Sequence, residues 1–484
     1  MPSSDDQPVE VRAFVSRLAQ LCGDPTAGLK DFLVPHRPVW VSRAPGRLDV
    51  MGGIADYSGS LVLQLPIAEA AMAALQTAQD DRLRVVSLPE RGEGPVRHFE
   101  IGLDDLRGLA DQSYEESCRW FREHDPDAWA AYVVGTLLVL ARHHEVRLDQ
   151  GLRLLIHSRV PEGKGVSSSA ALEVASMQAL AHHFGIALSG AQLAHLCQEV
   201  ENRIVGAPCG IMDQMTAALG QRDHMLALLC QPAEVLGFVP IAANIRFWGI
   251  DSGVRHAVSG SDYTSVRTGA FMGYRMLAEW AGLEVSAEAV PGRVRIVDPF
   301  WRGYLANVTP AEWSQRFGDR LPEEMVGEEF LELYQGTTDP VTRVEPERCY
   351  AVAAPTQHPI HEHDRVRRFS ALLGGPLSAA ALEEMGELMY GSHGSYSACG
   401  LGSPETDLLV QMVRVAGPAC GVYGAKITGG GSGGTVVVLG AADAGPVVAD
   451  IALRYAHRSG RSARVFSGSS SGACHFGALR VNLT

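Results

Sequence analysis

Hydrophobic residues recur along this chain in two patterns, and together these predict strands and helices in both halves. Alternation of hydrophobic with other residues indicates a strand, whereas hydrophobic residues three and four positions apart indicate a helix. Strands are predicted over residues 39–44, 61–67, 152–160, 237–251 and 436–439. Helices are predicted over residues 7–21, 128–144 and 167–184, the last of them ended by Gly185. A chain that mixes both elements throughout belongs to the α+β class.

Two stretches lack a clear pattern and are predicted to lie outside the main core. Residues 86–126 are polar and rich in Gly, Arg and Glu, which predicts an excursion over the surface. Residues 301–350 are rich in Pro, Glu and Trp and are predicted to cover the core. The strand-like run over 237–251 is predicted to cross between two domains.

The length and composition indicate a globular protein of two domains. A chain of 484 residues exceeds what one hydrophobic core holds, which is about 250–300 residues. Its hydrophobic share of 46% and charged share of 20% are ordinary for globular proteins. No hydrophobic run approaches the ~18 residues of a spanning helix, and the acidic N-terminus lacks the hydrophobic segment of a secretory signal. These features predict a cytoplasmic protein with no membrane partner, for which a monomer is favoured.

The charge balance and the cysteines narrow the class of partner. A net charge of −14 disfavours nucleic acid, because neutralising phosphates needs a basic surface. Phosphate could still be bound locally, through backbone N–H groups and a cation. The nine cysteines are scattered and form no CxxC pair, which predicts free thiols in a reducing compartment and no zinc site.

The first candidate site is the segment PEGKGVSSSA, residues 161–170, between a predicted strand and a predicted helix. Gly163 and Gly165 would let the backbone approach a ligand closely, and the three serines stand where the helix begins. Helix N-termini offer unpaired N–H groups and a positive dipole end, which suit phosphate. The alternative is a loop with a serine N-cap. The segment is not a Walker A loop, because GxxxxGK[ST] does not occur in the chain.

The second candidate is KITGGGSGG, residues 426–434. Gly429, Gly431 and Gly434 satisfy GxGxxG, but they lead into a strand, whereas the dinucleotide fingerprint leads into a helix. A strand, a glycine turn and a second strand can still place N–H groups against an anion. The alternative is a plain hairpin loop.

Two further segments carry charged residues in unusual places. Arg47 directly follows Pro-Gly in APGRLDVMGGIADY, and the alternative reading is an exposed turn with a surface ion pair. Asp213 stands between Met212 and Gln214 in a hydrophobic stretch that follows Glu201. Buried acids are rare unless they are paired or functional, so a solvated face is a poor explanation for Asp213.

One cluster of histidines is a candidate metal site. His358, His361 and His363 lie close together beside Asp364, with a spacing that could bind a metal. The favoured alternative is a surface loop or the start of a helix.

Taken in order, these motifs resemble those of the GHMP kinase superfamily. PEGKGVSSSAALEV resembles its phosphate-binding motif, AKITGGGSGG its C-terminal glycine motif, APGRLDVMGGIADYSG the galactokinase signature and GAPCGIMDQM the segment with the catalytic Asp. The resemblance runs from about residue 40 to 480. It implies an S5-like N-terminal domain over 1–245, a ferredoxin-like C-terminal domain over 246–484, and an active site in the cleft between them.

The resemblance also implies a role for individual residues. Asp213 would be the general base for the anomeric hydroxyl of a sugar, and Arg47 would hold it ionised and stabilise the transferred phosphoryl group. Ser169 and Glu201 would hold Mg²⁺. ATP would be bound by Gly163, Lys164, Gly165, Val166, Ser167, Ser168 and Ser169. The sugar would be bound by Arg47, Gly53, Ile54, Asp56, Asp213 and Tyr263.

The sugar itself is indicated by a departure from the galactokinase pattern. Where galactokinases have Glu-His-Thr-Asp, this chain has Gly53, Ile54, Ala55 and Asp56, so only the last residue is kept. The runs GGIADYSGSLVLQLPI and RFWGIDSGVRHAVSGSDY are most similar to the kinase domain of L-arabinokinases, whose plant members carry an additional N-terminal domain. These features imply phosphorylation of L-arabinose at its anomeric hydroxyl, with D-galactose as the alternative. A uronic acid would need a cation where Ile54 stands, and a silent sugar sensor would not need the four retained site residues Arg47, Ser169, Glu201 and Asp213.

Overall fold

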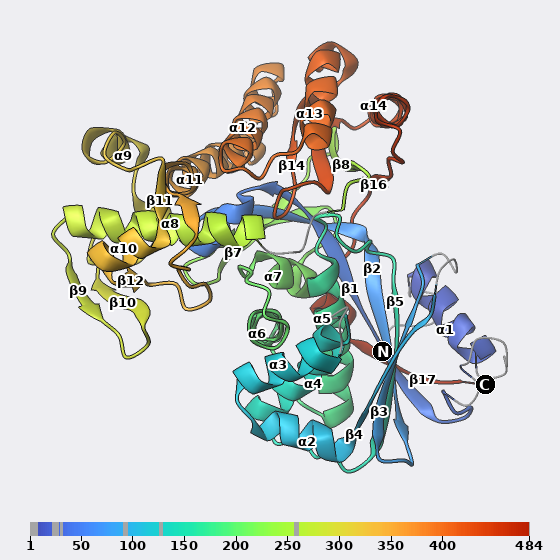
Figure 1. Cartoon of the computed structure of the whole chain (residues 1–484). Helices are drawn as coiled ribbons and strands as arrows, with labels where there is room; N and C mark the ends of the chain where they lie inside the picture. Colours follow the sequence, from blue (N-terminus) through green and yellow to red (C-terminus); the bar gives the residue numbers. More distant parts are fainter. Residues whose placement is uncertain are drawn as a thin grey trace.

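The computed structural model describes residues 8–21, 29, 32–90, 95–124, 129–255 and 261–483. Figure 1 shows a large twisted sheet with α2 to α7 on one side and α1 on the other, a smaller sheet with helices beyond its end, and a third group of short elements at the far left. The α+β prediction is confirmed, since strands and helices alternate along both halves of the chain.

Strands of the large sheet are β1 (Pro38–Met51), β2 (Leu61–Ala78), β3 (Arg82–Leu88), β4 (Arg97–Gly102), β5 (Gly151–Ser158), β6 (His224–Leu229), β7 (Glu234–Pro240) and β17 (Ala478–Asn482). The smaller sheet holds β8 (Ile245–Asp251), β14 (Val422–Ile427), β15 (Thr435–Ala441) and β16 (Val465–Ser467). Short strands elsewhere are β9 (Glu284–Ala287), β10 (Gly292–Val297), β11 (Glu324–Val326), β12 (Gly336–Thr337) and β13 (Cys349–Ala351).

The helices of the first half are α1 (Val9–Leu21), η2 (Gly53–Ser58), α2 (Leu103–Asp111), α3 (Tyr114–His124), α4 (Trp129–His143), α5 (Ser168–Phe184), α6 (Gly190–Glu199), η3 (Val200–Val205) and α7 (Met212–Leu219). Those of the second half are α8 (Ser261–Trp280), η4 (Leu305–Asn307), α9 (Pro310–Arg316), α10 (Gly327–Tyr334), α11 (Ala353–Leu373), α12 (Ala379–Ala398), α13 (Pro404–Ala416), η5 (Pro418–Cys420), α14 (Gly445–Ser459) and α15 (Ala473–Phe476).

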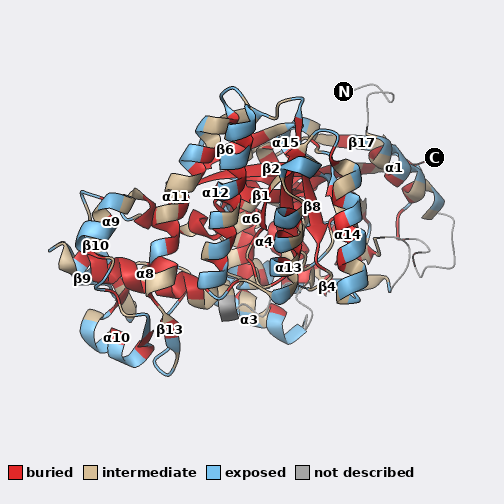
Figure 2. Cartoon of the chain, turned by 90° about the horizontal axis from the view of Figure 1, so that it is seen from above, coloured by how far each residue is buried: buried red, intermediate tan, exposed pale blue. Residues whose placement is uncertain are grey.

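The large sheet is buried on both faces, which explains why hydrophobic residues are nearly continuous along its central strands. Its order is β17-β1-β2-β5-β3-β4, with β6 on the outer part of β2 and β7 on β6. Leu154 points into the core under α4 and α5, whereas its neighbour Leu155 points to the opposite face, which α1 covers. Figure 2 shows this continuous buried band through the centre of the molecule.

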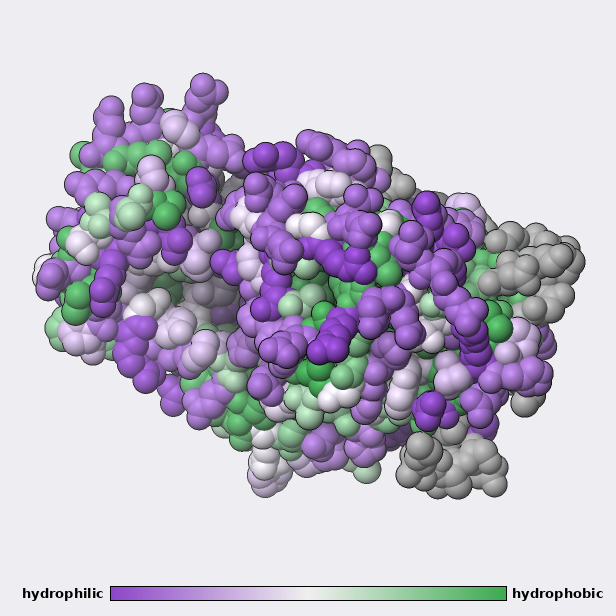
Figure 3. All heavy atoms as spheres, turned by 90° about the horizontal axis from the view of Figure 1, so that it is seen from below, coloured by the Kyte–Doolittle hydropathy of each residue, from purple (hydrophilic) through white to green (hydrophobic). Residues whose placement is uncertain are grey.

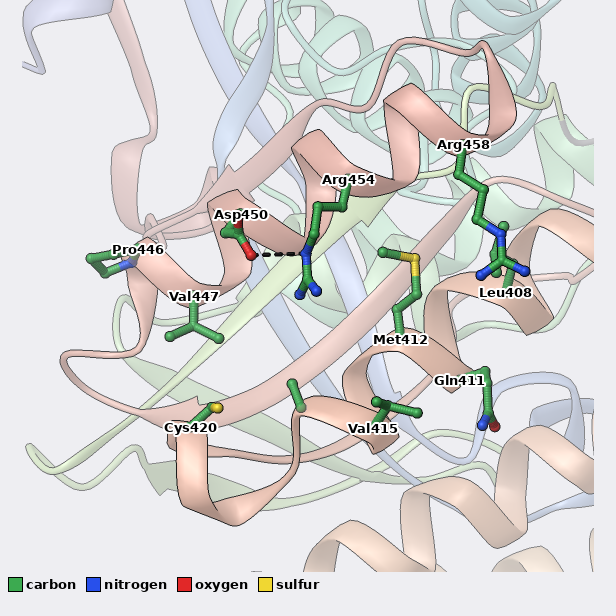
Figure 4. A pocket seen from close by; sticks show the side chains of 11 residues that line it. Leu408, Gln411, Met412, Val415, Cys420, Pro446, Val447, Asp450, Arg454 and Arg458 are labelled. Carbon is green, nitrogen blue, oxygen red and sulfur yellow. Dashed lines mark ion pairs between the residues drawn. The ribbon is translucent and has the colours of Figure 1, made fainter.

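The smaller sheet has the order β14-β15-β8-β16 and packs against α12, α13 and α14. Its strands β14 and β15 are the antiparallel pair on either side of the glycine motif, as predicted for a strand, a glycine turn and a strand. Between α13 and α14 lies a surface cavity of about 790 Å³, with hydrophobic side chains on its floor and the exposed Arg454–Asp450 pair at its edge (Figure 4).

The prediction that residues 301–350 cover the core is wrong. This stretch, together with α8 and α11, forms a hydrophobic core of its own around Trp301, Trp313 and Phe330. The large aromatic residues that break the periodicity are the ones that fill this small core, because short elements need bulky side chains to bury enough surface.

Two other predictions from the hydrophobic pattern need correction. Residues 86–126 are not a plain surface excursion, since they contain β4, α2 and α3, and both Leu106 and Phe121 are buried in the main core. The run over 237–251 is two strands, β7 and β8, separated at residues 241–244. The remaining predicted strands and helices are confirmed over their described residues; residues 7 and 128 lie outside them.

The domain division at residues 245 and 246 stays a prediction. Strand β8, which begins at Ile245, is the first strand of the smaller sheet, whereas β17 at the end of the chain returns to pair with β1.

Seen from below, the surface is mainly hydrophilic with scattered hydrophobic patches, and it is hollowed between the part that contains α8 to α10 and the helices of the first half (Figure 3). Among the described residues, no helix is both long enough and hydrophobic enough to span a membrane.

Candidate active site

Arg47 and Asp213 meet in a two-point ion pair at the centre of the molecule. Nε and Nη2 of Arg47 each donate to a carboxylate oxygen of Asp213, both at 2.9 Å, and Nη1 donates to the carbonyl oxygen of Gly165 at 2.7 Å. Arg47 is only 2% exposed, so the alternative of an exposed turn is wrong. One guanidinium thus connects the predicted base to the predicted phosphate loop.

A glycine in β1 makes this connection geometrically possible. A Cβ on Gly46 would lie 2.5 Å from the carbonyl oxygen of Val166, so a residue with a side chain would push the two segments apart. The N–H group of Arg47 donates to that same carbonyl oxygen at 3.1 Å. The sequence Pro-Gly-Arg therefore serves to lay β1 directly against the phosphate loop.

The two glycine-rich segments lie against each other, backbone to backbone. A Cβ on Gly429 would lie 2.7 Å from the carbonyl oxygen of Gly165, and one on Gly434 would lie 2.8 Å from that of Lys164. The hydroxyl of Thr435 donates to the Lys164 carbonyl at 2.8 Å. Lys164 itself pairs with Asp251 at the end of β8, with Nζ and Oδ1 3.1 Å apart. The second glycine segment is therefore more than a plain hairpin loop.

Two serine hydroxyls at this junction have unused hydrogen-bonding capacity. Ser167 precedes α5 in a left-handed conformation with φ at 60° and makes no side-chain capping bond, contrary to the N-cap alternative. Within the described residues, its buried Oγ and that of Ser432 have no hydrogen-bond partner. Buried polar groups are normally paired, so both hydroxyls fit a bound polyanion.

Ser169 and Glu201 lie together beside a second buried acid. The Glu201 carboxyl accepts from Nε2 of Gln214 at 2.7 Å and is hydrogen-bonded to Ser169. The same amide nitrogen lies 3.3 Å from Oε2 of Glu173. Burial raises the pKa of Glu201, and the negative charge of Asp213 raises it further. Burial likewise raises the pKa of Glu173.

This group of oxygen atoms fits a magnesium ion that also binds substrate. Carboxylate and hydroxyl oxygens are the hard ligands that Mg²⁺ prefers. In the part of the chain that the structure describes, no three His, Cys, Asp or Glu residues are grouped to hold a metal. Mg²⁺ commonly takes one or two protein ligands and completes its shell with phosphates and water, so Ser169 and Glu201 suffice.

Asp56, on η2, lies close to the Arg47–Asp213 pair. It is 4% exposed, and a Cβ on Gly210 would lie 1.6 Å from its carboxylate, which explains the glycine two residues before Met212. Burial raises the pKa of Asp56 to about 7, and the charge of Asp213 contributes. Tyr263 on α8 packs edge-on against Tyr57, with ring centroids 5.9 Å apart. These residues form one wall beside the predicted base.

Gly53 and Ile54 do not expose side-chain surface to a ligand. Ile54 is fully buried in a hydrophobic cluster with Val266, Tyr396 and Leu401. Gly53 has φ at +43°, and a Cβ there would lie 1.5 Å from the hydroxyl of Tyr396. The side chain of Ile54, predicted to bind the sugar, is thus turned into the protein.

Two buried ion pairs around the site were not found from the sequence. Lys426 donates to Oδ2 of Asp49 at 2.7 Å, and both side chains are fully buried. Arg267 donates twice to Asp339, each at 2.7 Å, and once to the carbonyl oxygen of Cys209 at 3.2 Å. Both pairs join residues far apart in the chain, so only the acids and bases themselves, within hydrophobic surroundings, could have signalled them.

The histidine cluster lies inside α11, so its placement in a surface loop or at a helix start is wrong. Nδ1 of His363 accepts from the N–H group of Leu61 at 3.0 Å, and His358 is buried against Ser395. Burial lowers the pKa of both His358 and His363 to about 4. Both are neutral structural groups near pH 7.

Comparisons with known proteins agree with this arrangement. The GHMP kinases N terminal domain matches residues 131–221, and the GHMP kinases C terminal domain matches residues 377–457. A galactokinase of Chloroflexus aurantiacus is 31% identical over 429 residues, which cover 88% of this chain and 90% of that protein. The chain belongs to the GHMP kinase family.

Within this family, an L-arabinokinase of Arabidopsis thaliana is 45% identical over 485 residues, covering 92% of this chain. The alignment covers 47% of that relative, so this chain spans about half its length. The crystal structure of Lactococcus lactis galactokinase complexed with galactose has a TM-score of 0.69 at 20% identity, over 98% of this chain and 100% of that one. A mevalonate kinase structure has a TM-score of 0.53 at 13% identity, over 89% and 99%. The predicted two-domain GHMP kinase fold is confirmed.

Proposed function

We propose that this protein is an ATP-dependent sugar 1-kinase that transfers the γ-phosphoryl group of ATP to the anomeric hydroxyl of L-arabinose. The observation that carries the proposal is the two-point ion pair between Arg47 and Asp213. The guanidinium of Arg47 also donates to the carbonyl oxygen of Gly165 in the phosphate loop. A silent sensor has no need to hold a carboxylate against the phosphate-binding backbone. The 45% identity to an L-arabinokinase supports this choice of sugar.

In the proposed reaction, Asp213 accepts the proton of the sugar's anomeric hydroxyl. The anomeric oxygen bonds to the γ-phosphorus of ATP, and the bond from that phosphorus to the leaving ADP breaks. Arg47 fixes both carboxylate oxygens and so orients the base, while its positive charge lies beside the loop that holds the phosphates. Phosphoryl transfer depends mainly on positioning and on stabilising charge, and these residues supply both.

The phosphates of ATP are assigned to residues 163–169 and the facing glycine segment. The N-terminus of α5, the free hydroxyls of Ser167 and Ser432 and the nearby Lys164 are suited to an anion. Ser169 and Glu201 would hold Mg²⁺, which neutralises charge on the phosphates when it is bound.

D-galactose is the second candidate, since galactokinases are among the relatives. The C6 hydroxymethyl group is what galactopyranose has and arabinopyranose lacks. The segment at 53–54 presents no side-chain acceptor for it, because Gly53 has none and Ile54 is buried. Leaving that hydroxyl unpaired would cost roughly 1–3 kcal/mol.

A side-by-side measurement of ADP release with a sugar panel tests the proposal. We expect kcat/KM for L-arabinose to exceed that for D-galactose by about 5–150-fold, the equivalent of that cost. A value for galactose equal to or above that for arabinose would overturn the choice of sugar. Absence of turnover with every sugar would overturn the kinase activity.

Removal of either proposed metal ligand should raise the requirement for Mg²⁺. Ser169→Ala and Glu201→Gln each remove an oxygen ligand of the kind that hard cations prefer. The measurement is the rate against free Mg²⁺ at saturating ATP, with Ser314→Ala, an exposed serine of α9, as the control. Curves that coincide with wild type in both variants would place the metal elsewhere.

The raised pKa of Asp56 predicts a pH dependence of sugar capture. Below about pH 7 the carboxyl is protonated, and above it the carboxylate can accept strong hydrogen bonds from sugar hydroxyls. We therefore expect kcat/KM for the sugar to rise with pH through about 7, because this parameter reports groups of the free enzyme. Asp56→Asn should remove that inflection and lower the plateau. An unchanged inflection in the variant would assign it to another group.

A further inference from the structure

Tyr396, in the last turns of α12, lies between two loops that come from opposite ends of the chain. Its side chain is fully buried. The hydroxyl accepts a hydrogen bond from the N–H group of Ile54 at 2.9 Å and donates one to the carbonyl oxygen of Gly429 at 3.0 Å. One oxygen atom thus connects η2, which carries Asp56, to the glycine segment that faces the phosphate loop.

The surroundings hold this tyrosine in one place. Nζ of Lys426 lies 5.1 Å from the centroid of the tyrosine ring, and His358 packs edge-on at 5.3 Å. Lys426 pairs with Asp49, whose Oδ1 accepts from the N–H group of Gly53 at 2.9 Å. Two consecutive N–H groups, those of Gly53 and Ile54, are therefore held by Asp49 and Tyr396.

Tyr396 also restricts which residue can stand at position 53, together with the positive φ of +43° there and Oδ2 of Asp49, which would lie 2.7 Å from an added Cβ. That Cβ would lie 1.5 Å from the hydroxyl oxygen of Tyr396 and 2.7 Å from the ring carbon Cζ. Contacts under 3.0 Å with two atoms of a rigid, packed ring cannot be relieved by a small shift. A tyrosine at 396 and a side chain at 53 are mutually exclusive in this arrangement.

We propose that Tyr396 is a positioning residue that couples the sugar-binding loop, residues 53–58, to the nucleotide-binding glycine segment and sets the sugar selectivity of that loop. It does so without touching the sugar, by fixing the backbone at Gly53 and Ile54 and by excluding a side chain at 53. This inference rests on the proposed function. The hydroxyl is bonded to both loops, so a shift of the glycine segment on nucleotide binding would be transmitted to the sugar loop.

The first test is Tyr396→Phe, which removes the hydroxyl and keeps the ring. Sugar affinity is measured by calorimetry with and without a non-hydrolysable ATP analogue. We expect wild-type affinity to rise at least about fivefold with the analogue, a typical coupling factor. In the variant, affinity should fall by about 5–150-fold, the range for leaving a buried N–H group unpaired, and the effect of the analogue should shrink to near unity.

The matched control is Tyr350→Phe. Tyr350 is another buried tyrosine whose hydroxyl accepts a backbone N–H group, that of Glu345 at 2.9 Å, in the separate core around Trp301. It should lower thermal stability without changing the effect of the analogue. Equal coupling in wild type and Tyr396→Phe, or none in wild type, would overturn the proposal.

The second test concerns the steric role of Tyr396 at position 53, on which the proposed selectivity depends, and uses Gly53→Ala alone and together with Tyr396→Leu. The single substitution should abolish measurable sugar binding, and the double variant should recover part of it, because the clash with the hydroxyl is gone. Additive losses would overturn the steric role. Both tests use whichever sugar of the panel the wild-type protein phosphorylates fastest, so an error in choosing L-arabinose does not decide the role of Tyr396.

Discussion

Asp213→Asn is expected to lower kcat by about 10²–10⁴, the usual contribution of a general base. The amide has the shape of the carboxylate but cannot take the proton of the sugar hydroxyl. Because Arg47 holds both oxygens of Asp213 at 2.9 Å, the side chain is already oriented, and the loss should fall on the chemical step. Phosphoryl transfer in single-turnover experiments is the measurement.

The binding of both substrates serves as the control for this variant. Affinity for the sugar and for a non-hydrolysable ATP analogue should stay within a few-fold of wild type. A variant with kcat within a few-fold of wild type would remove Asp213 from the chemistry. Asp450→Asn changes an acid that is exposed in the pair with Arg454 (Figure 4), and it should leave kcat unchanged.

Local motifs of the site could be predicted because each depends on a short stretch of backbone. The phosphate loop needs glycines and serines between a strand and a helix, and the second glycine segment needs glycines between two strands. Both elements formed where the pattern placed them. Asp213 could be singled out because an acid among hydrophobic residues needs a partner, and Arg47 is that partner.

The rest of the site depends on contacts between residues that are far apart in the sequence. The spacing of residues within a short motif does not predict such contacts. Lys426 and Asp49 are 377 residues apart, and Tyr396 and Ile54 are 342 apart. The sequence showed that the side chain at 53 is missing but not that Tyr396 fills its space. For the same reason, Ile54 was expected to face the sugar, whereas its methyl groups are buried against Tyr396 and Val266. The hydrophobic character of a side chain does not show whether it packs in the protein interior or contacts a ligand.

The buried pair between Lys426 and Asp49 predicts the second large effect. Lys426→Met should lower the free energy of unfolding by about 3–5 kcal/mol, the cost of leaving one member of a buried pair without its partner. Both side chains have 0% exposure, so water cannot solvate the carboxylate that remains. The substitution also removes the hydrogen bond from Nζ to the carbonyl oxygen of Ile427 at 2.7 Å. Urea unfolding followed by circular dichroism measures the change.

Arg454→Met is the matched control, because it breaks a pair whose side chains are 57% and 61% exposed. Exposed pairs contribute about 0–1 kcal/mol, so this variant should unfold close to wild type. Asp49→Asn added to Lys426→Met should recover part of the loss, since it removes the orphaned charge while Oδ1 still accepts from Gln64 and from the N–H group of Gly53. If Lys426→Met is as stable as Arg454→Met, or if Asp49→Asn only adds to the loss, the pair does not hold the two ends of the chain together. In that case the sugar loop is positioned chiefly by Tyr396 and by the hydrophobic cluster around Ile54.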